Sequence, residues 1–224
     1  MKLLTLALVL VTGGVFAQAT RSLGGVNFTV IDPVAYAFNA DTGRLSAGQR
    51  FVIDGRVASI SGAYLNLLDT GLNSFTLNAP MRSLSFGASV TIFVEVTRVN
   101  RLFGTADARI VRIEGAGVAA AQIQPSTGTR SLDGVQYQVI TPEEYAFNAD
   151  TGRLRPGQRF VMDGQVSSIS GASLWLINTG LNSFRLSAPL RLDFMTNVTV
   201  FFEVTSVNSM FGMAEARVVR IETR

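Results

Sequence analysis

Four aspartates recur at matching places in two halves of this chain: Asp41 and Asp54 in the first half, Asp150 and Asp163 in the second. A pair of carboxylates can serve as general acid and general base, so carboxylate-based hydrolysis is the catalytic chemistry that the sequence could support. We favour a structural interpretation. The first aspartate of each pair precedes Thr-Gly at a predicted helix end, and the second flanks a glycine inside a predicted strand.

Other catalytic chemistry lacks the side chains that it needs. Lys2 is the only lysine, and the chain contains no histidine and no cysteine. These absences exclude Ser-His-Asp and Cys-His sites and zinc sites built on thiolates or imidazoles. The segment Asn39–Gly43 has a partial likeness to a calcium loop, but it lacks the alternating acidic ligands and the late glutamate. We therefore expect a protein that is not an enzyme and has no cofactor or metal.

The N-terminal residues have the pattern of a secretory signal peptide. Lys2 gives one positive charge, an apolar run spans Leu3 to Val11, and small residues end the segment at Ala17-Gln18-Ala19. The apolar run is too short for a transmembrane helix. We expect residues 1–19 to be removed by cleavage after Ala19, leaving a periplasmic or secreted chain with no transmembrane segment.

Composition predicts a folded protein without a broad basic surface. The 224 residues are 47% hydrophobic and 16% charged, which suits one large or two small domains. Without Lys2 the chain has 18 arginines against 16 carboxylates, a net charge of +2. Such a small net charge does not predict a broad positive surface for nucleic acid, although local arginine clusters could still bind anions.

The chain contains a tandem duplication. Residues 20–114, which we call unit 1, align with residues 129–222 with one single-residue deletion near Ser85. Residues 129–224 are unit 2. Each unit is large enough to be a domain, so we interpret the repeat as two domains and not as a solenoid. Residues 115–128 between them are rich in Gly, Ala, Ser and Pro and have the composition of a linker.

Each unit should begin with a short extended segment, Val26–Ile31 in unit 1, followed by a helix of about two turns. In unit 2 the residues Thr141-Pro142-Glu143-Glu144 form a capping-box pattern. Asp32 has the same capping role in unit 1. The helix sequence Tyr-Ala-Phe-Asn-Ala-Asp-Thr-Gly-Arg-Leu, identical at 36–45 and 145–154, could be a ligand motif. We interpret it instead as a helix that closes one end of a barrel with Tyr36 and Phe38.

Alternating apolar and polar residues with many β-branched side chains predict five strands per unit. In unit 1 these strands cover residues 50–60, 63–69, 72–79, 89–99 and 104–113. We expect a bulge at Gly55, which would let the first strand pair on both sides. An even register in the last hairpin would place Glu95 opposite Arg109 and Thr97 opposite Asp107.

These elements resemble those of the periplasmic bacterial OB-fold family. The resemblance rests on the helix, the glycine-interrupted strand FVIDGRV, the strand and turn YLNLLDTG, and the final hairpin VTIFVEV and ADARIVRIE. It covers about 80 residues of each unit. It implies a mainly β fold of two tandem five-stranded Greek-key barrels, each preceded by a short helix, with the binding surface on strands two and three and adjoining loops.

The units differ where that binding surface would be exposed. In strands two and three, Tyr64 is matched by Ser173, Asn66 by Trp175 and Thr76 by Arg185, and we expect Trp175 to lie opposite Arg185. In the loop between strands four and five, Arg98, Arg101 and Phe103 correspond to Ser206, Ser209 and Phe211. The candidate binding residues are Tyr64, Asn66, Arg98, Arg101, Phe103, Trp175, Arg185 and Phe211.

Two functions follow from these residues. The first is an exported, non-enzymatic binding or adaptor protein of the cell envelope, which recognises a protein or peptide partner through barrel faces and loops. The alternative is a protein that binds oligonucleotides, single-stranded DNA among them, or oligosaccharides by stacking them on aromatic and arginine side chains. A surface tryptophan packed under arginine or against the other unit is the structural interpretation of the same residues.

Overall fold

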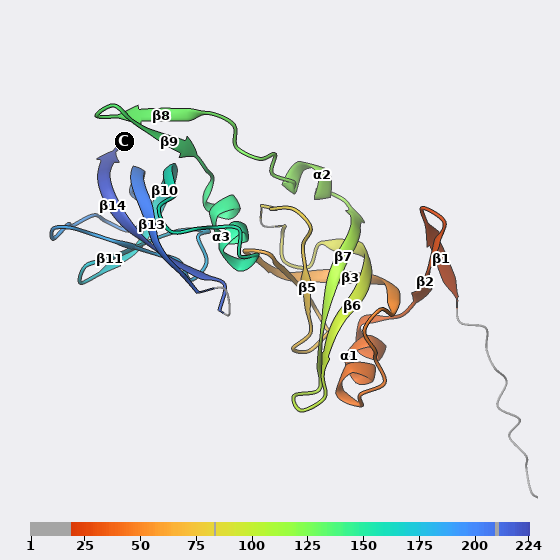
Figure 1. The fold of residues 1–224 in the computed structure, drawn as a ribbon. Coiled ribbons are helices and arrows are strands. Elements are labelled where there is room, and N and C mark those ends of the chain that lie inside the picture. Colours follow the sequence, from red (N-terminus) through yellow and green to blue (C-terminus); the bar gives the residue numbers. More distant parts are fainter. Residues whose placement is uncertain (1–18, 83, 209–210) are drawn as a thin grey trace, which may run out of the picture.

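The computed structural model describes residues 19–82, 84–208 and 211–224 and contains two barrels in tandem (Figure 1). The predicted signal peptide, residues 1–19, lies outside the described residues except for Ala19. No helix among the described residues is long and apolar enough to cross a membrane.

Five strands close each barrel. In unit 1 they are β3 (Arg50–Ser61), β4 (Tyr64–Leu67), β5 (Ser74–Thr76), β6 (Ser89–Asn100) and β7 (Thr105–Gly115). Their spatial order is β3-β4-β5-β7-β6, and β6 pairs again with β3. Unit 2 repeats this closure with β10 (Arg159–Ser170), β11 (Ser173–Leu176), β12 (Ser183–Arg185), β13 (Asn197–Asn208) and β14 (Met213–Thr223). This order is that of the OB-fold, so the predicted tandem OB-like barrels are confirmed.

A hairpin precedes each barrel where only one extended segment was expected. In unit 1 it consists of β1 (Thr20–Leu23) and β2 (Val26–Val30), and in unit 2 of β8 (Thr129–Leu132) and β9 (Val135–Val139). β2 runs parallel to the start of β3, and Phe28 packs on Val52 and Phe93 in a separate small core. The hairpin thus buries apolar side chains that point out of the barrel.

The helices α1 (Pro33–Asp41) and α3 (Pro142–Asp150) begin at the predicted caps. The Asp32 carboxylate accepts a hydrogen bond from the Ala35 amide at 2.8 Å, and the Thr141 hydroxyl accepts one from the Glu144 amide at 3.2 Å. Only half of the predicted capping box forms, because the Glu144 carboxylate accepts instead from the Ser126 amide.

One aromatic residue of each helix fills its barrel. Tyr36 and Tyr145 are fully buried, and the Tyr145 ring lies 5.2 Å from that of Phe202 and 5.6 Å from that of Phe184. Burial raises the pKa of both tyrosines. The expectation that Phe38 also plugs the barrel is wrong, since its side chain is 53% exposed. A helix of two turns directs only one face into the barrel mouth, and Phe38 lies two residues from Tyr36.

The predicted bulge at Gly55 is displaced along the strand. Gly55 lies in regular register with Val90, and the irregularity falls between Val57 and Ser59, where β3 pairs with β4. A Cβ at position 55 would lie 2.9 Å from Leu67 Cδ1, so a larger residue there would require the Leu67 side chain to shift. β3 does pair with β6 along its first part and with β4 along its second, as expected.

The final hairpin confirms one predicted pair and corrects the other. Glu95 lies opposite Arg109, but a bulge between Val96 and Arg98 places Arg98 opposite Asp107, not Thr97. Unit 2 has the same shift, so Glu203 faces Arg217 while Ser206 faces Glu215. The alternation of residue types contains no signal for this inserted residue.

The first half of the predicted linker packs on unit 1. It forms the short helix α2 (Val118–Ala121), whose residues Val118 and Ala121 join the core of unit 1. Gln122 makes an isolated β-bridge with Met81. The chain therefore leaves unit 1 along a fixed path before it enters β8.

Replacing Tyr145 by phenylalanine should change the stability of unit 2 by no more than about 1 kcal/mol, because no described protein group accepts its hydroxyl. Tyr145→Ala should cost about 3–5 kcal/mol, because it removes the ring from the barrel core. Trp175, the single tryptophan, lies in unit 2, so its fluorescence during urea denaturation measures this unit. Equal losses in both variants would contradict the assignment of the stability to ring packing.

Candidate functional site

Two of the four candidate aspartates are held in ion pairs. The Asp54 carboxylate accepts from Arg21 at 3.1 and 2.7 Å and from the Thr91 hydroxyl at 2.6 Å, and its pKa is lowered, chiefly by the hydrogen bond from Thr91. Asp163 has the matching pair with Arg130, and hydrogen bonds from Arg130 and Thr199 lower its pKa to about 2. These carboxylates fasten the N-terminal hairpin of each unit to its barrel.

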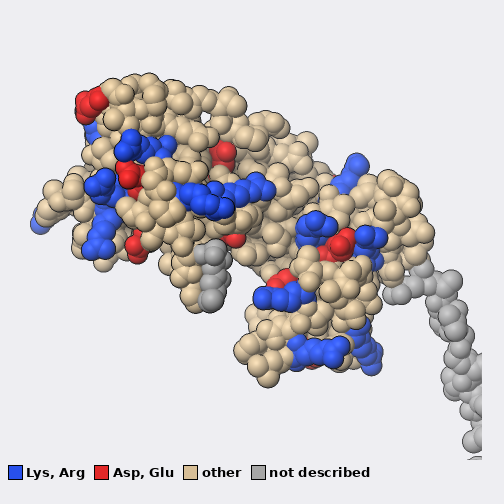
Figure 2. Space-filling model, in the orientation of Figure 1, with Lys and Arg blue, Asp and Glu red and all other residues tan. Residues whose placement is uncertain are grey.

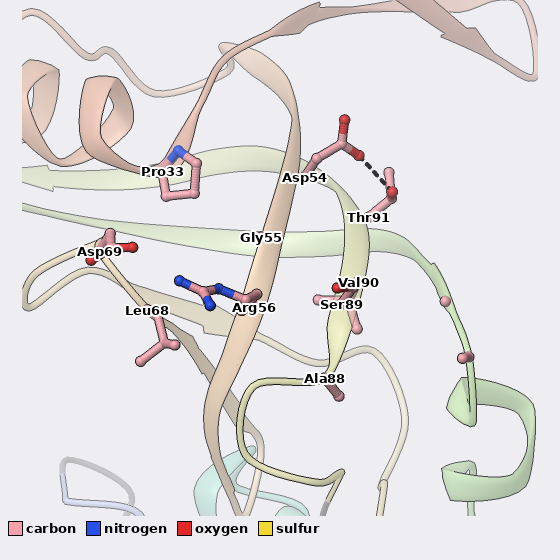
Figure 3. Close-up of a pocket in the computed structure, with 12 residues that line it drawn as sticks. Pro33, Asp54, Gly55, Arg56, Leu68, Asp69, Ala88, Ser89, Val90 and Thr91 are labelled. Atoms are coloured by element: carbon pink, nitrogen blue, oxygen red, sulfur yellow. Dashed lines mark hydrogen bonds between the residues drawn. The ribbon is translucent and has the colours of Figure 1, made fainter.

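Asp54 also lines an open cavity of about 870 Å³ in unit 1 (Figure 3). Arg56 and Asp69 line the same cavity, and the Arg56 side chain extends toward the side on which Leu68 and Asp69 lie. Asp41 lines a different cavity. The structure therefore does not bring Asp41 and Asp54 together as an acid and base pair.

The expected contact between Trp175 and Arg185 is wrong by two residues. Arg185 pairs with Ser173, and Leu174 pairs with Phe184. β11 and β12 pair only at the ends that lie away from their connecting loop. The half-buried Trp175 therefore lies diagonally from Arg185 on the same face. The sequence alternation fixed the faces of these strands but left the register to the loop between them.

On the outside of unit 2, Arg185 is the first of a row of paired residues on neighbouring strands, which we call the arginine row. Arg185 pairs with Arg217, Arg217 with Glu203, and Glu203 with Arg159. Glu203 contacts Arg159 at 3.1 Å and Arg217 at 3.7 Å, which leaves the row with an excess of positive charge. On the face drawn in Figure 2, arginines and carboxylates are interspersed over both units, and the arginines are the more numerous.

The other candidate residues lie on β4, on β6 and in the loops between the last two strands of the two units. Tyr64 and Asn66 lie on β4, and the Asn66 amide donates to the Ser59 hydroxyl at 3.0 Å. Arg98 forms an ion pair with Asp107 at 2.8 Å. The remaining candidates are exposed residues of the loops between the last two strands: Arg101, Phe103 and Phe211. The residue that corresponds to Arg101, Ser209, lies outside the described residues.

An apolar groove, which we call the α1 groove, runs beside helix α1 of unit 1. It encloses about 380 Å³ between α1, the β4–β5 loop and the β6–β7 loop. Its apolar lining is strongly exposed: 62% for Val34, 53% for Phe38 and 69% for Phe103. Asp41 contributes a carboxylate to the same groove.

The corresponding surface of unit 2, the α3 groove, holds a turn of unit 1. The Asp150 carboxylate accepts a hydrogen bond from the Ala63 amide at 2.8 Å, and a side chain on Gly62 would collide with that carboxylate. Phe147, the counterpart of Phe38, is only 1% exposed and packs in the core cluster of unit 1. The β3–β4 turn (Ser61-Gly62-Ala63) is therefore seated on α3.

The pKa values of two side chains at the junction are raised. Burial raises the pKa of Asp150, while the hydrogen bond from Ala63 acts in the opposite direction. Burial also raises the pKa of Tyr64, and the nearby Asp150 and Asp107 charges raise it further. Tyr64 thus lies beside the junction of the units, with 38% of its surface exposed.

Sequence reasoning missed both grooves. Phe38 and Phe147 lie in identical ten-residue segments, so nothing local distinguishes the exposed ring from the buried one. The one available signal was the turn Ile-Ser-Gly-Ala, which is repeated at 60–63 and 169–172.

Fold and site together define a protein of two tandem OB-fold barrels, in which the second holds a turn of the first. Among solved structures, the telomere capping protein Ten1 from Saccharomyces pombe matches with 14% identity and a TM-score of 0.29, over 39% of this chain and 80% of that chain. The S. pombe Stn1-Ten1 complex matches with 22% identity and a TM-score of 0.30, over 42% and 82%. Similarity this low carries no inference about function. Protein-family models and curated protein sequences give no match.

Asp163 should stabilise the protein in a pH-dependent way. Its pKa is lowered from 3.8 to about 2 in the fold, so its contribution is present at neutral pH and is lost as the pH falls through this range. Asp163→Asn should therefore unfold at a lower temperature than the wild type at pH 7, and the difference should shrink between about pH 4 and pH 2.

Thermal unfolding followed by Trp175 fluorescence measures this difference. The exposed Asp193 offers a control, since Asp193→Asn removes one carboxylate of unit 2 without touching the ion pairs. A difference for Asp163→Asn that stays constant from pH 7 to pH 2 would contradict the proposed role.

Proposed function

We propose that this chain is an exported, non-enzymatic binding protein of the cell envelope that holds a protein or peptide partner in the α1 groove. One observation carries the proposal: the equivalent groove of unit 2 already holds a polypeptide turn through a buried aromatic ring and a carboxylate. The α1 groove has the same two groups, Phe38 and Asp41, in the same sequence.

The exposure of the α1 groove supports a partner. Val34, Phe38, Leu72 and Phe103 line one hollow and are each more than half exposed. Contiguous apolar surface of this kind, bordered by polar groups, is typical of protein interaction sites. The Asp41 carboxylate provides an acceptor for a backbone amide of the partner, as Asp150 does for Ala63.

The roles of the aspartates favour binding over catalysis. Asp54 and Asp163 are engaged by arginines, and Asp150 lies under the β3–β4 turn. Export is supported by the N-terminal sequence and by the resemblance to the periplasmic OB-fold family, and a mature chain that begins at Thr20 would be the evidence for it.

The groove can be tested with a displayed random-peptide library selected on the chain that starts at Thr20. Selected peptides should bind the wild type, and Phe38→Asp should weaken binding at least about tenfold, because it places a charge in the apolar contact. Phe86→Asp is the matched control, since Phe86 is a 76% exposed phenylalanine of unit 1 outside the groove. Binding that survives Phe38→Asp, or a library that yields no binder, counts against the proposal.

The arginine row of unit 2 favours a second function, the binding of an anionic oligonucleotide or oligosaccharide. Arg185 and Arg217 are cross-strand neighbours, both exposed, and half-buried Trp175 lies on the same face. In unit 1 the position of Arg185 is Thr76, so the charge is particular to unit 2. Arginine beside an aromatic ring suits both backbone phosphates and stacked bases or sugars.

Titration with single-stranded oligothymidylate and with a sulfated heparin oligosaccharide, followed by Trp175 fluorescence, tests this second function. For the oligonucleotide, Arg185→Glu should weaken binding and reduce the slope of log K against log salt by about 0.7 or more. Arg191→Glu, an exposed arginine of the same unit, should leave the slope nearly unchanged. A wild-type chain that gives no fluorescence response to either ligand excludes this function.

A further inference from the structure

The two units carry the same pair of complementary surfaces, and among the described residues only one of each is used within the chain. The β3–β4 turn of unit 1 occupies the α3 groove of unit 2. This leaves the α1 groove of unit 1 and the β10–β11 turn (Ser170-Gly171-Ala172) of unit 2. Nothing in the described chain lies within 4 Å of a Cβ built on Gly171, whereas Gly62 is in close contact with α3.

We propose that the β10–β11 turn of one copy docks in the α1 groove of a second copy, in the same way that the β3–β4 turn docks in the α3 groove. The proposal rests on the proposed function of the α1 groove and identifies its partner. Copies would then join head to tail, each repeating the contact that already exists between the units.

The sequences of both surfaces support this repetition. The turn reads Ile-Ser-Gly-Ala at 60–63 and again at 169–172, and the helix segments 36–45 and 145–154 are identical. Gly62 and Gly171 have the same left-handed conformation, with φ of 55° and 58°. Both turns therefore present the same backbone amide, that of Ala63 in one and Ala172 in the other.

The acceptor for that amide is held in the same place in both grooves. In unit 2 the Asp150 carboxylate lies against Gly212 of the β13–β14 loop, and in unit 1 the Asp41 carboxylate lies against Gly104 of the β6–β7 loop. In each case a side chain on the loop glycine would collide with the carboxylate. Asp41 is thus positioned to accept from Ala172 as Asp150 accepts from Ala63.

Two matched pairs of residues differ in exposure between the contact that is made and the one that is missing. Ala63 is 1% exposed and its counterpart Ala172 is exposed. Phe147 is 1% exposed and its counterpart Phe38 is 53% exposed. Docking of a second copy would cover these two residues, Ala172 and Phe38, in one contact.

Next to the β10–β11 turn, unit 2 has a positive charge that unit 1 lacks, and this charge suits a contact with the Asp41 carboxylate. Tyr64 borders the occupied groove and pairs across strands with Thr76. At the same positions beside the β10–β11 turn, unit 2 has Ser173 paired with Arg185. In the contact between copies, the Ala172 amide would meet Asp41 of the other copy. Arg185 would lie opposite Ser173, the residue after Ala172, and its positive charge would favour the Asp41 carboxylate.

The contact joins two different surfaces, so its symmetry is heterologous and the assembly stays open unless the rotation closes a ring. It also lacks residues 115–128, which tether the units within one chain. A short tether supplies an effective concentration of the order of millimolar, so association between copies should need a concentrated protein.

Sedimentation velocity on the chain that starts at Thr20, up to about 1 mM, tests the proposal with three proteins. The wild type should sediment faster as its concentration rises, without a plateau at the dimer. Phe38→Asp, which spoils the groove, and Ala172→Arg, which blocks the turn, should each remain monomeric. Both positions are exposed in the single chain, so neither change disturbs its own core.

An equimolar mixture of the two variants gives the decisive result. Ala172→Arg keeps an intact groove and Phe38→Asp keeps an intact turn, so the mixture should form dimers and nothing larger. Phe86→Asp should associate like the wild type. A monomeric wild type, or a mixture that does not recover dimers, overturns the proposal.

The two proposals fail differently. A chain that stays monomeric while displayed peptides still depend on Phe38 refutes the second copy as occupant and leaves the groove as a peptide site. Loss of Phe38-dependent peptide binding together with monomeric behaviour refutes both. A groove-to-groove contact would be revealed if Ala172→Arg associated as well as the wild type, and this also overturns the proposal.

Discussion

The hydrogen bond from the Ala63 amide to the Asp150 carboxylate, 2.8 Å long, joins the two barrels, and much of the remaining structure depends on it. Hydrogen bonds to a charged acceptor contribute about 1.5–3 kcal/mol, but burial of that charge opposes this contribution, as the raised pKa of Asp150 indicates. The carboxylate therefore sets the geometry more than it sets the strength of the junction. Phe147, buried in the core cluster of unit 1, supplies an apolar contribution of about 1.5–3 kcal/mol.

The two units share the same helix residues, but these residues lie in different surroundings in the folded chain. The Phe147 ring is part of an internal interface, whereas Phe38 in the same sequence faces solvent. A tandem pair with one kind of contact necessarily leaves one surface of that kind uncovered at each end. The ion pairs of Arg21 with Asp54 and of Arg130 with Asp163, by contrast, each form within one unit and are present in both units.

The junction also changes which parts of an OB-fold can bind a ligand. The surface of strands two and three with its adjoining loops is the usual site of this fold. Here the β3–β4 turn belongs to that region and is covered by α3, and Tyr64 lies beside the junction. The open surfaces are instead the α1 groove of unit 1 and the arginine row of unit 2, which differ in chemistry, one apolar and one cationic.

The helix and the barrel strands of each unit could be predicted from the residues alone, because strand alternation, helix caps and turn residues are local signals, and the repeat contains them twice. The sequence also predicted the faces of the strands and the pairs Glu95 with Arg109 and Glu203 with Arg217. The bulges that place Arg98 opposite Asp107 and the register that separates Trp175 from Arg185 could be seen only in the folded chain. The difference between Phe38 and Phe147 also depends on the folded chain, since burial there depends on a contact between residues 87 positions apart, Ala63 and Asp150. Local sequence fixes which way a side chain points from its own backbone, whereas its neighbours come from distant parts of the chain.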